Sequence, residues 1–174
     1  SAVMDSYTLG IRRTFLYELL EDRNDTPVTS LEPHYGLFRS DGRPKPAAIA
    51  LHNLITILAP EHGLASSTRS PVSYSLKTPG LTFSPDVADM QLLMQKADGT
   101  NVLVLWTEPP LWDPGQRRER PPVKAQSISL RLSQAYATVR VYDPLVSAKP
   151  KKTYADVSEV SLDVPDHPVI ITFK

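Results

Sequence analysis

The chain has 174 residues, of which 41% are hydrophobic and 22% charged, and 19 basic residues balance 19 acidic ones. This apolar content excludes a wholly disordered chain, and the balanced charge gives no bulk attraction for a nucleic acid or a membrane surface. The apolar runs are too short for a membrane-spanning helix, and the lack of cysteine excludes disulfides and thiolate chemistry. Seventeen prolines against seven glycines favour short strands and ordered loops over a helical bundle.

The first sixty residues have the pattern of an α/β fragment. Residues 3–9 indicate the end of a helix, which Gly10 closes as a C-terminal cap. Residues 11–19, with the sequence IRRTFLYEL, are rich in β-branched and aromatic side chains, and this composition predicts a buried strand. The polar, turn-forming stretch at residues 20–33 predicts a loop.

An amphipathic helix is predicted over residues 47–58. The turn Asp41-Gly42-Arg43-Pro44 leads into it, and Pro46 occupies the first helical position, where a missing N–H costs no helical hydrogen bond. Pro60 ends the pattern. Apolar residues recur at intervals of three and four and form one stripe, of the kind that a helix turns toward a core: Ala47, Ala50, Leu51, Leu54, Ile55 and Leu58.

Beyond a Ser-rich linker at residues 61–71, the sequence consists of short strand patterns. Asp98-Gly99 separates two of them and is the strongest hairpin signal in the chain, so we expect a turn of the two-residue type with positive φ at its central residues. The predicted strands are residues 72–77, 81–84, 90–96, 101–107, 123–132, 137–142, 157–164 and 169–173. Their number and spacing predict an antiparallel β-sandwich.

Several stretches carry a resemblance to a known family. RTFLYELLED (residues 13–22) followed by HYGLFRSDGRPKPAAIALHNL (residues 34–54) resembles the last strand and helix of (β/α)8-barrel glycoside hydrolases, with family 39 the nearest comparison. LLMQKADGTNVLVLWTE (residues 92–108) and VSLDVPDHPVIITF (residues 160–173) resemble strands of the β-sandwich that follows such barrels. Two features depart from the pattern: Tyr35 stands where phenylalanine is expected, and the loop around Trp112 has no counterpart.

The resemblance implies a mainly β fold, an antiparallel β-sandwich over residues 72–174 preceded by a strand–helix remnant of a (β/α)8 barrel over residues 1–60. It implies the C-terminal fragment of a retaining glycoside hydrolase, whose sandwich is a structural domain packed on the barrel. No cofactor is implied, and the partners are the remainder of the barrel and, through the parent enzyme, an oligo- or polysaccharide. The catalytic carboxylates of such enzymes, about 5 Å apart, sit on the fourth and seventh strands, so no catalytic residue is expected in this chain.

Four residues are candidates for substrate binding. Tyr17 and Glu18 end the predicted strand, where barrel enzymes bind their substrates, and Asp22 follows in an acidic loop that also contains Glu21. Trp112 lies in a proline-rich loop, where an exposed indole can stack on a sugar ring. A purely structural interpretation stays open for each candidate. Tyr17 can pack within the strand, the carboxylates can be solvated, and Trp112 can cover the edge of a core.

Other kinds of site find little support in the sequence. The four histidines do not cluster, so no metal site is predicted, and neither a nucleophilic-serine motif nor a glycine-rich phosphate loop is present. The arginines of the proline-rich loop can grip an anionic sugar or form a solvated charged loop. These are Arg117, Arg118 and Arg120.

Two other classes of function stay open. The first is a carbohydrate-binding module, which exposed aromatic side chains along one sheet face or loop rim would favour. The second is an interaction domain, in which an apolar patch pairs two copies of the chain as a homodimer. The orphaned barrel elements supply such a patch, with Phe15, Leu16, Ile49 and Leu54 as its members. The sequence indicates neither the sugar nor the cellular compartment.

Overall fold

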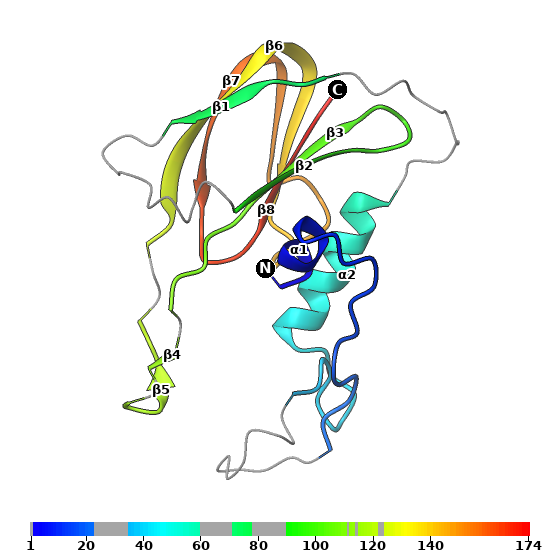
Figure 1. The fold of residues 1–174 in the computed structure, drawn as a ribbon, viewed down its shortest axis with the longest axis vertical. Helices are drawn as coiled ribbons and strands as arrows, with labels where there is room; N and C mark the ends of the chain where they lie inside the picture. The colour runs from blue at the N-terminus through cyan, green and yellow to red at the C-terminus, as the bar shows by residue number, and fades with distance from the viewer. Residues whose placement is uncertain are drawn as a thin grey trace.

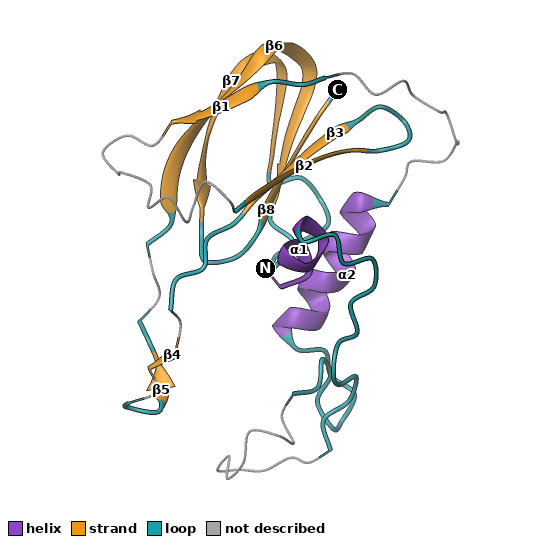
Figure 2. Ribbon diagram, viewed as in Figure 1, coloured by secondary structure: helices purple, strands orange, loops and turns teal. Residues whose placement is uncertain are grey.

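The computed structural model describes residues 2–22, 35–59, 71–77, 90–110, 112–113, 115–121 and 124–174. Two helices, α1 (Ala2–Thr8) and α2 (Pro46–Leu58), lie together beside a curled β-sheet (Figure 1). Strands dominate the described part of the chain (Figure 2). The predicted fold class, mainly β with antiparallel pairing, is confirmed. Among the described residues, neither helix is long and apolar enough to cross a membrane.

Helix α1 ends as its sequence predicts. Gly10 has φ +78°, its N–H donates to the Tyr7 carbonyl at 2.9 Å, and the Ile11 N–H donates to the Ser6 carbonyl at 2.9 Å. This pair of hydrogen bonds is the Schellman arrangement, which satisfies carbonyls that the last helical turn leaves free. Met4 is the buried residue of this helix.

Helix α2 begins at Pro46, as predicted, and its end is held from outside. Gly42, with φ +81°, closes the preceding turn through an N–H bond to the Arg39 carbonyl at 2.8 Å. At the other end, Lys96 Nζ donates to the carbonyls of Ile57 at 2.5 Å and Ala59 at 3.1 Å. A lysine at this point satisfies free carbonyls and complements the negative end of the helix dipole.

The buried face of α2 overlaps the predicted apolar stripe only in part, because Leu54 and Leu58 of the stripe pack partly against the sheet cluster. Ala48, Asn53 and Ile57 are buried, whereas Ile55 of the stripe is 61% exposed. The polar Asn53 is accommodated because its Nδ2 donates to the Pro144 carbonyl at 2.8 Å. The position of the sheet therefore decides which face is buried, and the rest of the apolar stripe is left partly or fully exposed among the described residues.

The buried strand predicted over residues 11–19 is wrong. This segment is irregular and its large side chains are exposed, with Phe15 at 88%, Tyr17 at 74% and Leu19 at 68%. A strand needs neighbours that satisfy its backbone. Only its end finds one among the described residues, where the N–H of Leu37 donates to the Glu18 carbonyl at 2.9 Å.

The main sheet contains six antiparallel strands in the order β1-β6-β8-β3-β2, with β7 paired to β6. They are β1 (Tyr74–Lys77), β2 (Gln91–Gln95), β3 (Asn101–Leu105), β6 (Gln126–Tyr142), β7 (Lys152–Val164) and β8 (Val169–Phe173). A separate small ribbon is formed by β4 (Trp112–Asp113) and β5 (Arg118–Glu119). The predicted strand at residues 81–84 and nearly all of the predicted linker at residues 61–71 lie outside the described residues.

Strand β6 unites two strands that the sequence predicts separately. Its first half pairs with β1 and its second half with β8, while β7 follows both halves. The register against β7 shifts between Arg131 and Tyr136, and an irregularity of this kind bends a strand. The bend lets one sheet curl around a core, which gives a sandwich-like arrangement.

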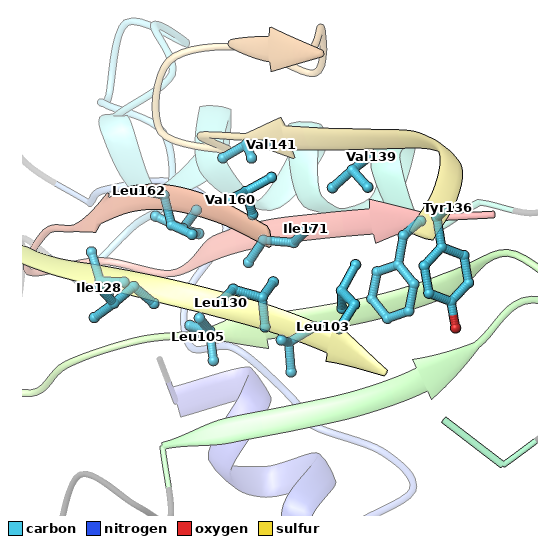
Figure 3. Close-up of a cluster of buried hydrophobic side chains, with 14 residues drawn as sticks. Leu103, Leu105, Ile128, Leu130, Tyr136, Val139, Val141, Val160, Leu162 and Ile171 are labelled. Carbon is cyan, nitrogen blue, oxygen red and sulfur yellow. The ribbon is translucent and has the colours of Figure 1, made fainter. Parts of the chain in front are cut away.

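The enclosed core is made of side chains from β3, β6, β7 and β8 that face one another (Figure 3). Tyr136 and Phe173 pack edge to face there, with ring centroids 4.8 Å apart. The curl is closed by a side chain, because the Tyr74 hydroxyl of β1 donates to Gln91 Oε1 of β2 at 2.8 Å. These are the two end strands of the sheet path.

A second apolar cluster joins the helices to the outer face of the sheet. Every residue of β3 and β8 is buried, because side chains of one set enter the enclosed core and those of the other set meet the helices. The second cluster contains Met4, Ile57, Val102, Val104, Trp106 and Ile170. The predicted division between residues 1–60 and 72–174 therefore runs through a shared core.

The Asp98-Gly99 hairpin between β2 and β3 is confirmed, but the predicted turn type is wrong. Three residues form the loop: the Lys96 N–H donates to the Thr100 carbonyl at 2.8 Å, and the Gly99 N–H donates to the Lys96 carbonyl at 3.0 Å. Gly99 has φ +83°, and Asp98 is not among the residues with positive φ. This is the three-residue hairpin in which only the last residue adopts the left-handed conformation.

Candidate functional site

Three of the four predicted site residues lie together at the end of the irregular segment. Tyr17 and Asp22 are exposed, and Glu18 is half-buried. The peptide carbonyls of Glu18 and Leu19 accept hydrogen bonds from Leu37 and Phe38, both at 2.9 Å. The backbone of these candidates is therefore anchored, while Tyr17 and Asp22 face outward.

The anchor is a compact arrangement of three chain pieces, residues 18–21, 36–39 and 43–45, which we call the loop clasp. Phe38 bridges Leu20 in parallel and Pro44 in antiparallel fashion. The Lys45 N–H donates to the Leu37 carbonyl at 2.9 Å, which connects the clasp to the start of α2. Two of the four stretches that resemble the family, at residues 13–22 and 34–54, meet in this clasp.

Glycine is required at position 36 of the clasp. A Cβ on Gly36 would lie 2.8 Å from the Leu20 carbonyl carbon and 2.8 Å from the Phe38 oxygen, closer than real side chains approach backbone atoms. The glycine of the motif thus permits a close approach of two chain pieces.

The carboxylate of Glu21 is buried within the clasp, where it forms an ion pair with Lys45 Nζ. Glu21 is 5% exposed, so the sequence-based interpretation of it as a solvated loop residue is wrong. A buried charge needs such a partner, because desolvation otherwise costs several kcal/mol. Lys45 of the Pro-Lys-Pro motif is visible in the sequence as a possible partner for a carboxylate, but nothing in the sequence pairs it with Glu21.

Trp112 is not brought together with the other candidates. It lies in β4, opposite Glu119 of β5, and the ribbon lies well apart from the loop clasp (Figure 1). The Asp113 carboxylate closes the ribbon turn, since its Oδ1 accepts from the N–H groups of Gly115 and Gln116, both at 3.0 Å. Arg117 and Arg118 are exposed there.

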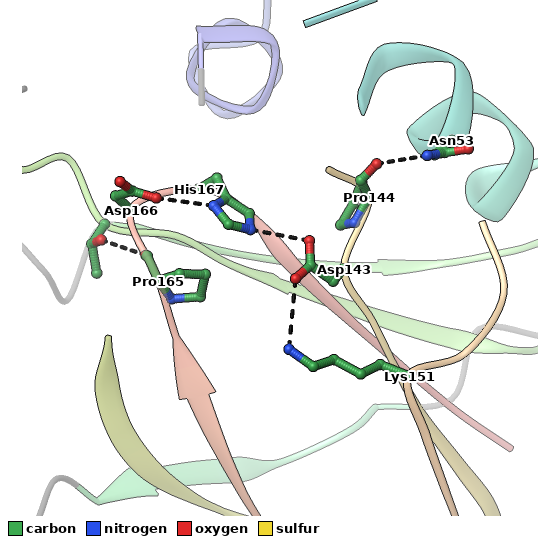
Figure 4. A network of polar contacts seen from close by, with 8 residues as sticks. Asn53, Asp143, Pro144, Lys151, Pro165, Asp166 and His167 are labelled. Atoms are coloured by element: carbon green, nitrogen blue, oxygen red, sulfur yellow. Dashed lines mark hydrogen bonds and ion pairs between the residues drawn. The ribbon is translucent and has the colours of Figure 1, made fainter. Parts of the chain in front are cut away.

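A polar network that the sequence did not indicate lies where two turns of the sheet meet α2 (Figure 4). His167 Nε2 lies 3.0 Å from Asp143 Oδ1, and His167 Nδ1 lies 3.0 Å from Asp166 Oδ1. Lys151 Nζ lies 3.7 Å from Asp143 Oδ2. The network ties the β6–β7 turn to the β7–β8 turn, next to the bond from Asn53 to Pro144. No group of His, Asp or Glu side chains among the described residues is arranged to hold a metal ion.

Two apolar grooves border the predicted stripe of α2. One, of about 260 Å³, lies between α1, α2 and the turns of the polar network, with His167 in its wall. The other, of about 620 Å³, runs from the irregular segment across α2 to β2. Leu16, Leu51 and Leu54 line both grooves. Of the side chains that the sequence predicts to be orphaned, Leu16 and Leu54 line these grooves, and Phe15, Leu16 and Ile49 are exposed.

A pair of carboxyl groups lies where α1 meets the sheet. The pKa of Asp5 is raised, first by partial burial and then by the neighbouring Glu108 carboxylate. The buried Trp106 indole opposes this shift, although its Nε1 makes no hydrogen bond of normal geometry.

No family model matches the sequence, and no curated protein is significantly similar to it. The likeness to barrel glycoside hydrolases therefore rests on the sequence motifs alone.

Proposed function

We propose that the chain is the C-terminal part of a retaining (β/α)8-barrel glycoside hydrolase. In this proposal the curled sheet is a structural domain packed on the barrel, and the catalytic carboxylates belong to barrel strands outside this chain. The observation that carries the proposal is the position of α2 between two surfaces. One face of the helix packs on the sheet, and the apolar stripe beside it lines open grooves.

A barrel helix that carries an appended domain is expected to have both surfaces. Its stripe covers the barrel strands, and its neighbouring face meets the domain. The irregular segment supports this assignment, because its composition is that of a strand while its backbone lacks a neighbouring strand among the described residues. Leu16 of this segment faces the same grooves as Leu51 and Leu54 of α2.

The loop clasp supports the same assignment. Gly36 and Lys45 belong to the motif that resembles the eighth helix and its preceding loop, and both make specific contacts with the segment that resembles the eighth strand. The clasp holds Tyr17, Glu18 and Asp22 at the end of that segment, where barrel enzymes bind the sugar. We assign these three residues to substrate binding in the parent enzyme.

A carbohydrate-binding module is the second candidate. Exposed large aromatic side chains of the described residues are Tyr7, Phe15, Tyr17 and Tyr35, and none belongs to the sheet. Stacking on a sheet face is therefore disfavoured for this part of the chain. The observation that favours a module is the separate ribbon, which carries Trp112 together with exposed Arg117 and Arg118.

The proposal is tested by joining the chain to the protein segment encoded directly upstream. The expected result is retaining hydrolysis of an aryl glycoside by the joined protein and none by the chain alone. Replacement of Glu18 or Tyr17 is expected to raise KM in the joined protein. The control Glu159→Gln, in β7 of the main sheet, is expected to leave KM unchanged. An upstream segment without a barrel pattern, or hydrolysis by the isolated chain, would contradict the proposal. Sugar binding that the loss of Trp112 abolishes would favour the module.

A further inference from the structure

Residues 11–22 carry opposite charges at their two ends and exposed apolar side chains between them. Arg12 and Arg13 open the segment, and Glu18 and Asp22 close it. The two arginines and Asp22 are exposed, and Glu18 is half-buried. Phe15 is the most exposed large apolar side chain of the described residues and lies midway between the charged ends.

The exposed apolar surface is large enough for a protein interface. Eight large side chains of this region are more than two-fifths exposed: Tyr7, Leu9, Ile11, Phe15, Leu16, Tyr17, Leu19 and Leu20. At roughly 100 Å² each they expose on the order of 800 Å² in total, so a face that gathers most of these side chains approaches what one partner contributes to an interface of standard size.

A two-fold axis makes this segment complementary to itself. In an interface between identical copies, residue i of one copy meets residue j of the other, and j meets i. When two such segments lie antiparallel with Phe15 near the axis, the basic end of each meets the acidic end of the other. A parallel arrangement would instead place like charges together.

We propose that two copies of this chain pair antiparallel along residues 11–22, with Phe15 at the axis. Arg12 of each copy then faces Glu18 of the other, with Arg13 beside this pair and Asp22 further along the same acidic end. This pairing does not rest on the proposed function, because it concerns the chain alone, when no barrel elements cover the same face. If the chain does not dimerise, the hydrolase assignment is unaffected. If the hydrolase assignment fails, the dimer proposal is unaffected.

Two charge-reversed variants test the proposal. The first, R12E/R13E, is acidic at both ends of the segment, and the second, E18K/D22K, is basic at both ends. We expect the unaltered chain to sediment as a dimer at high micromolar concentration and each variant to sediment as a monomer. An equimolar mixture of the two variants is expected to form a heterodimer, because the acidic ends of one then face the basic ends of the other. Far-UV circular dichroism and thermal melts establish that each variant is folded.

Two further variants separate this interface from general stickiness. Phe15→Asp is expected to abolish the dimer by placing two carboxylates at the axis. Glu159→Lys reverses a charge on the β6–β7 face, where Glu159 pairs with Arg131, and is expected to leave the dimer intact. A monomeric unaltered chain, dimers of either reversed variant alone, or a mixture that stays monomeric would each overturn the proposal.

Discussion

Residues 11–19 and strands β3 and β8 have similar strand-like compositions but differ in backbone structure and burial. The sequences NVLVL and VIITF lie between neighbours on both sides and are buried along their whole length. The sequence IRRTFLYEL has no neighbouring strand among the described residues, and its large side chains are exposed. The difference shows that composition supplies the propensity, whereas cross-strand neighbours supply the hydrogen bonds and the burial that make a strand.

Helix α2 lies between these two regions and belongs to both. Ile57 contributes to the apolar cluster on the outer face of the sheet, while Leu51 and Leu54 line the grooves beside the irregular segment. The helix therefore connects the sheet to the loop clasp. Within the clasp, the described contacts are one buried ion pair and a few backbone hydrogen bonds.

The largest expected effect comes from truncating one side chain in each region. Leu103 is fully buried in β3, so Leu103→Ala is expected to lower the free energy of unfolding by about 3–5 kcal/mol through lost burial and a cavity. Phe15→Ala is expected to change it by less than about 0.5 kcal/mol, as for an exposed site. Urea unfolding at a concentration that keeps the chain monomeric measures both. Equal losses would mean that the irregular segment belongs to the core.

The junction between the regions is tested within α2 itself. Ile57→Ala is expected to cost about 2–4 kcal/mol, because Ile57 packs with Val102, Val104 and Ile170 of the sheet. Ile55→Ala, two residues away on the exposed side, is the matched control, with an expected cost below about 0.5 kcal/mol. Thermal melts monitored by near-ultraviolet circular dichroism report on the sheet. A melt that Ile57→Ala leaves unchanged would show that residues 72–174 fold independently of the helices.

The hairpin turn gives an intermediate effect on the sheet side. Gly99 has φ +83°, which a β-branched residue adopts only with strain, so Gly99→Val is expected to cost on the order of 1–3 kcal/mol. Gly115, in the separate ribbon, is not among the glycines with positive φ and has ordinary space for a Cβ. Gly115→Val is therefore expected to leave the urea midpoint nearly unchanged. Similar shifts for both variants would argue against a specific turn at Gly99.

The smallest effect is a pH dependence that compares one turn in each region. The pKa of Asp98 is lowered chiefly by the Thr100 N–H, which donates to Oδ1 at 2.9 Å, and that of Asp41 by the Arg43 N–H in the same way at 3.0 Å. A lowered pKa contributes stability above the unfolded value of about 3.9, and this stability is lost as pH falls through the folded value.

We therefore expect Asp98→Asn to make the urea midpoint less sensitive to pH below about 4. The same change at Asp41 is expected to have less effect on global unfolding, because its turn lies outside the sheet. Identical acid profiles for Asp98→Asn and the unaltered chain would contradict this assignment.

The elements that the sequence predicted correctly are those specified by adjacent residues. Gly10 ends α1, Pro46 starts α2, and Gly99 permits the hairpin, because each acts through its own backbone conformation. The two halves of β6 were predicted as separate strands because the polar residues Ser133 and Gln134 interrupt the apolar alternation between them. A bend within one long strand and a break between two strands leave the same local pattern.

The contacts of the candidate site depend on residues far apart in the sequence. Glu21 meets Lys45 only because Gly36 lets two chain pieces approach closely, and His167 meets Asp143 only because two sheet turns converge on α2. No periodicity encodes such pairs. Tyr17, Glu18 and Asp22 were grouped by the sequence because they are neighbours in it, whereas Trp112 was added on residue type alone and lies elsewhere.

The curled sheet has a seam between its end strands: in the described part of the chain β1 and β2 are not paired through their backbones, and a side-chain hydrogen bond from Tyr74 to Gln91 spans the gap. Elsewhere the strands are joined by ladders of backbone hydrogen bonds, which open only when many bonds break together. At the seam, the bond from the Tyr74 hydroxyl to the Gln91 amide oxygen joins the edges of β1 and β2 through side chains. Strand β1 is attached to the sheet on one side by a short ladder to β6, whereas β3 and β8 each lie between two strands. The amide hydrogens of β1 are therefore expected to exchange with solvent sooner than those of β3 and β8, which are protected until global unfolding.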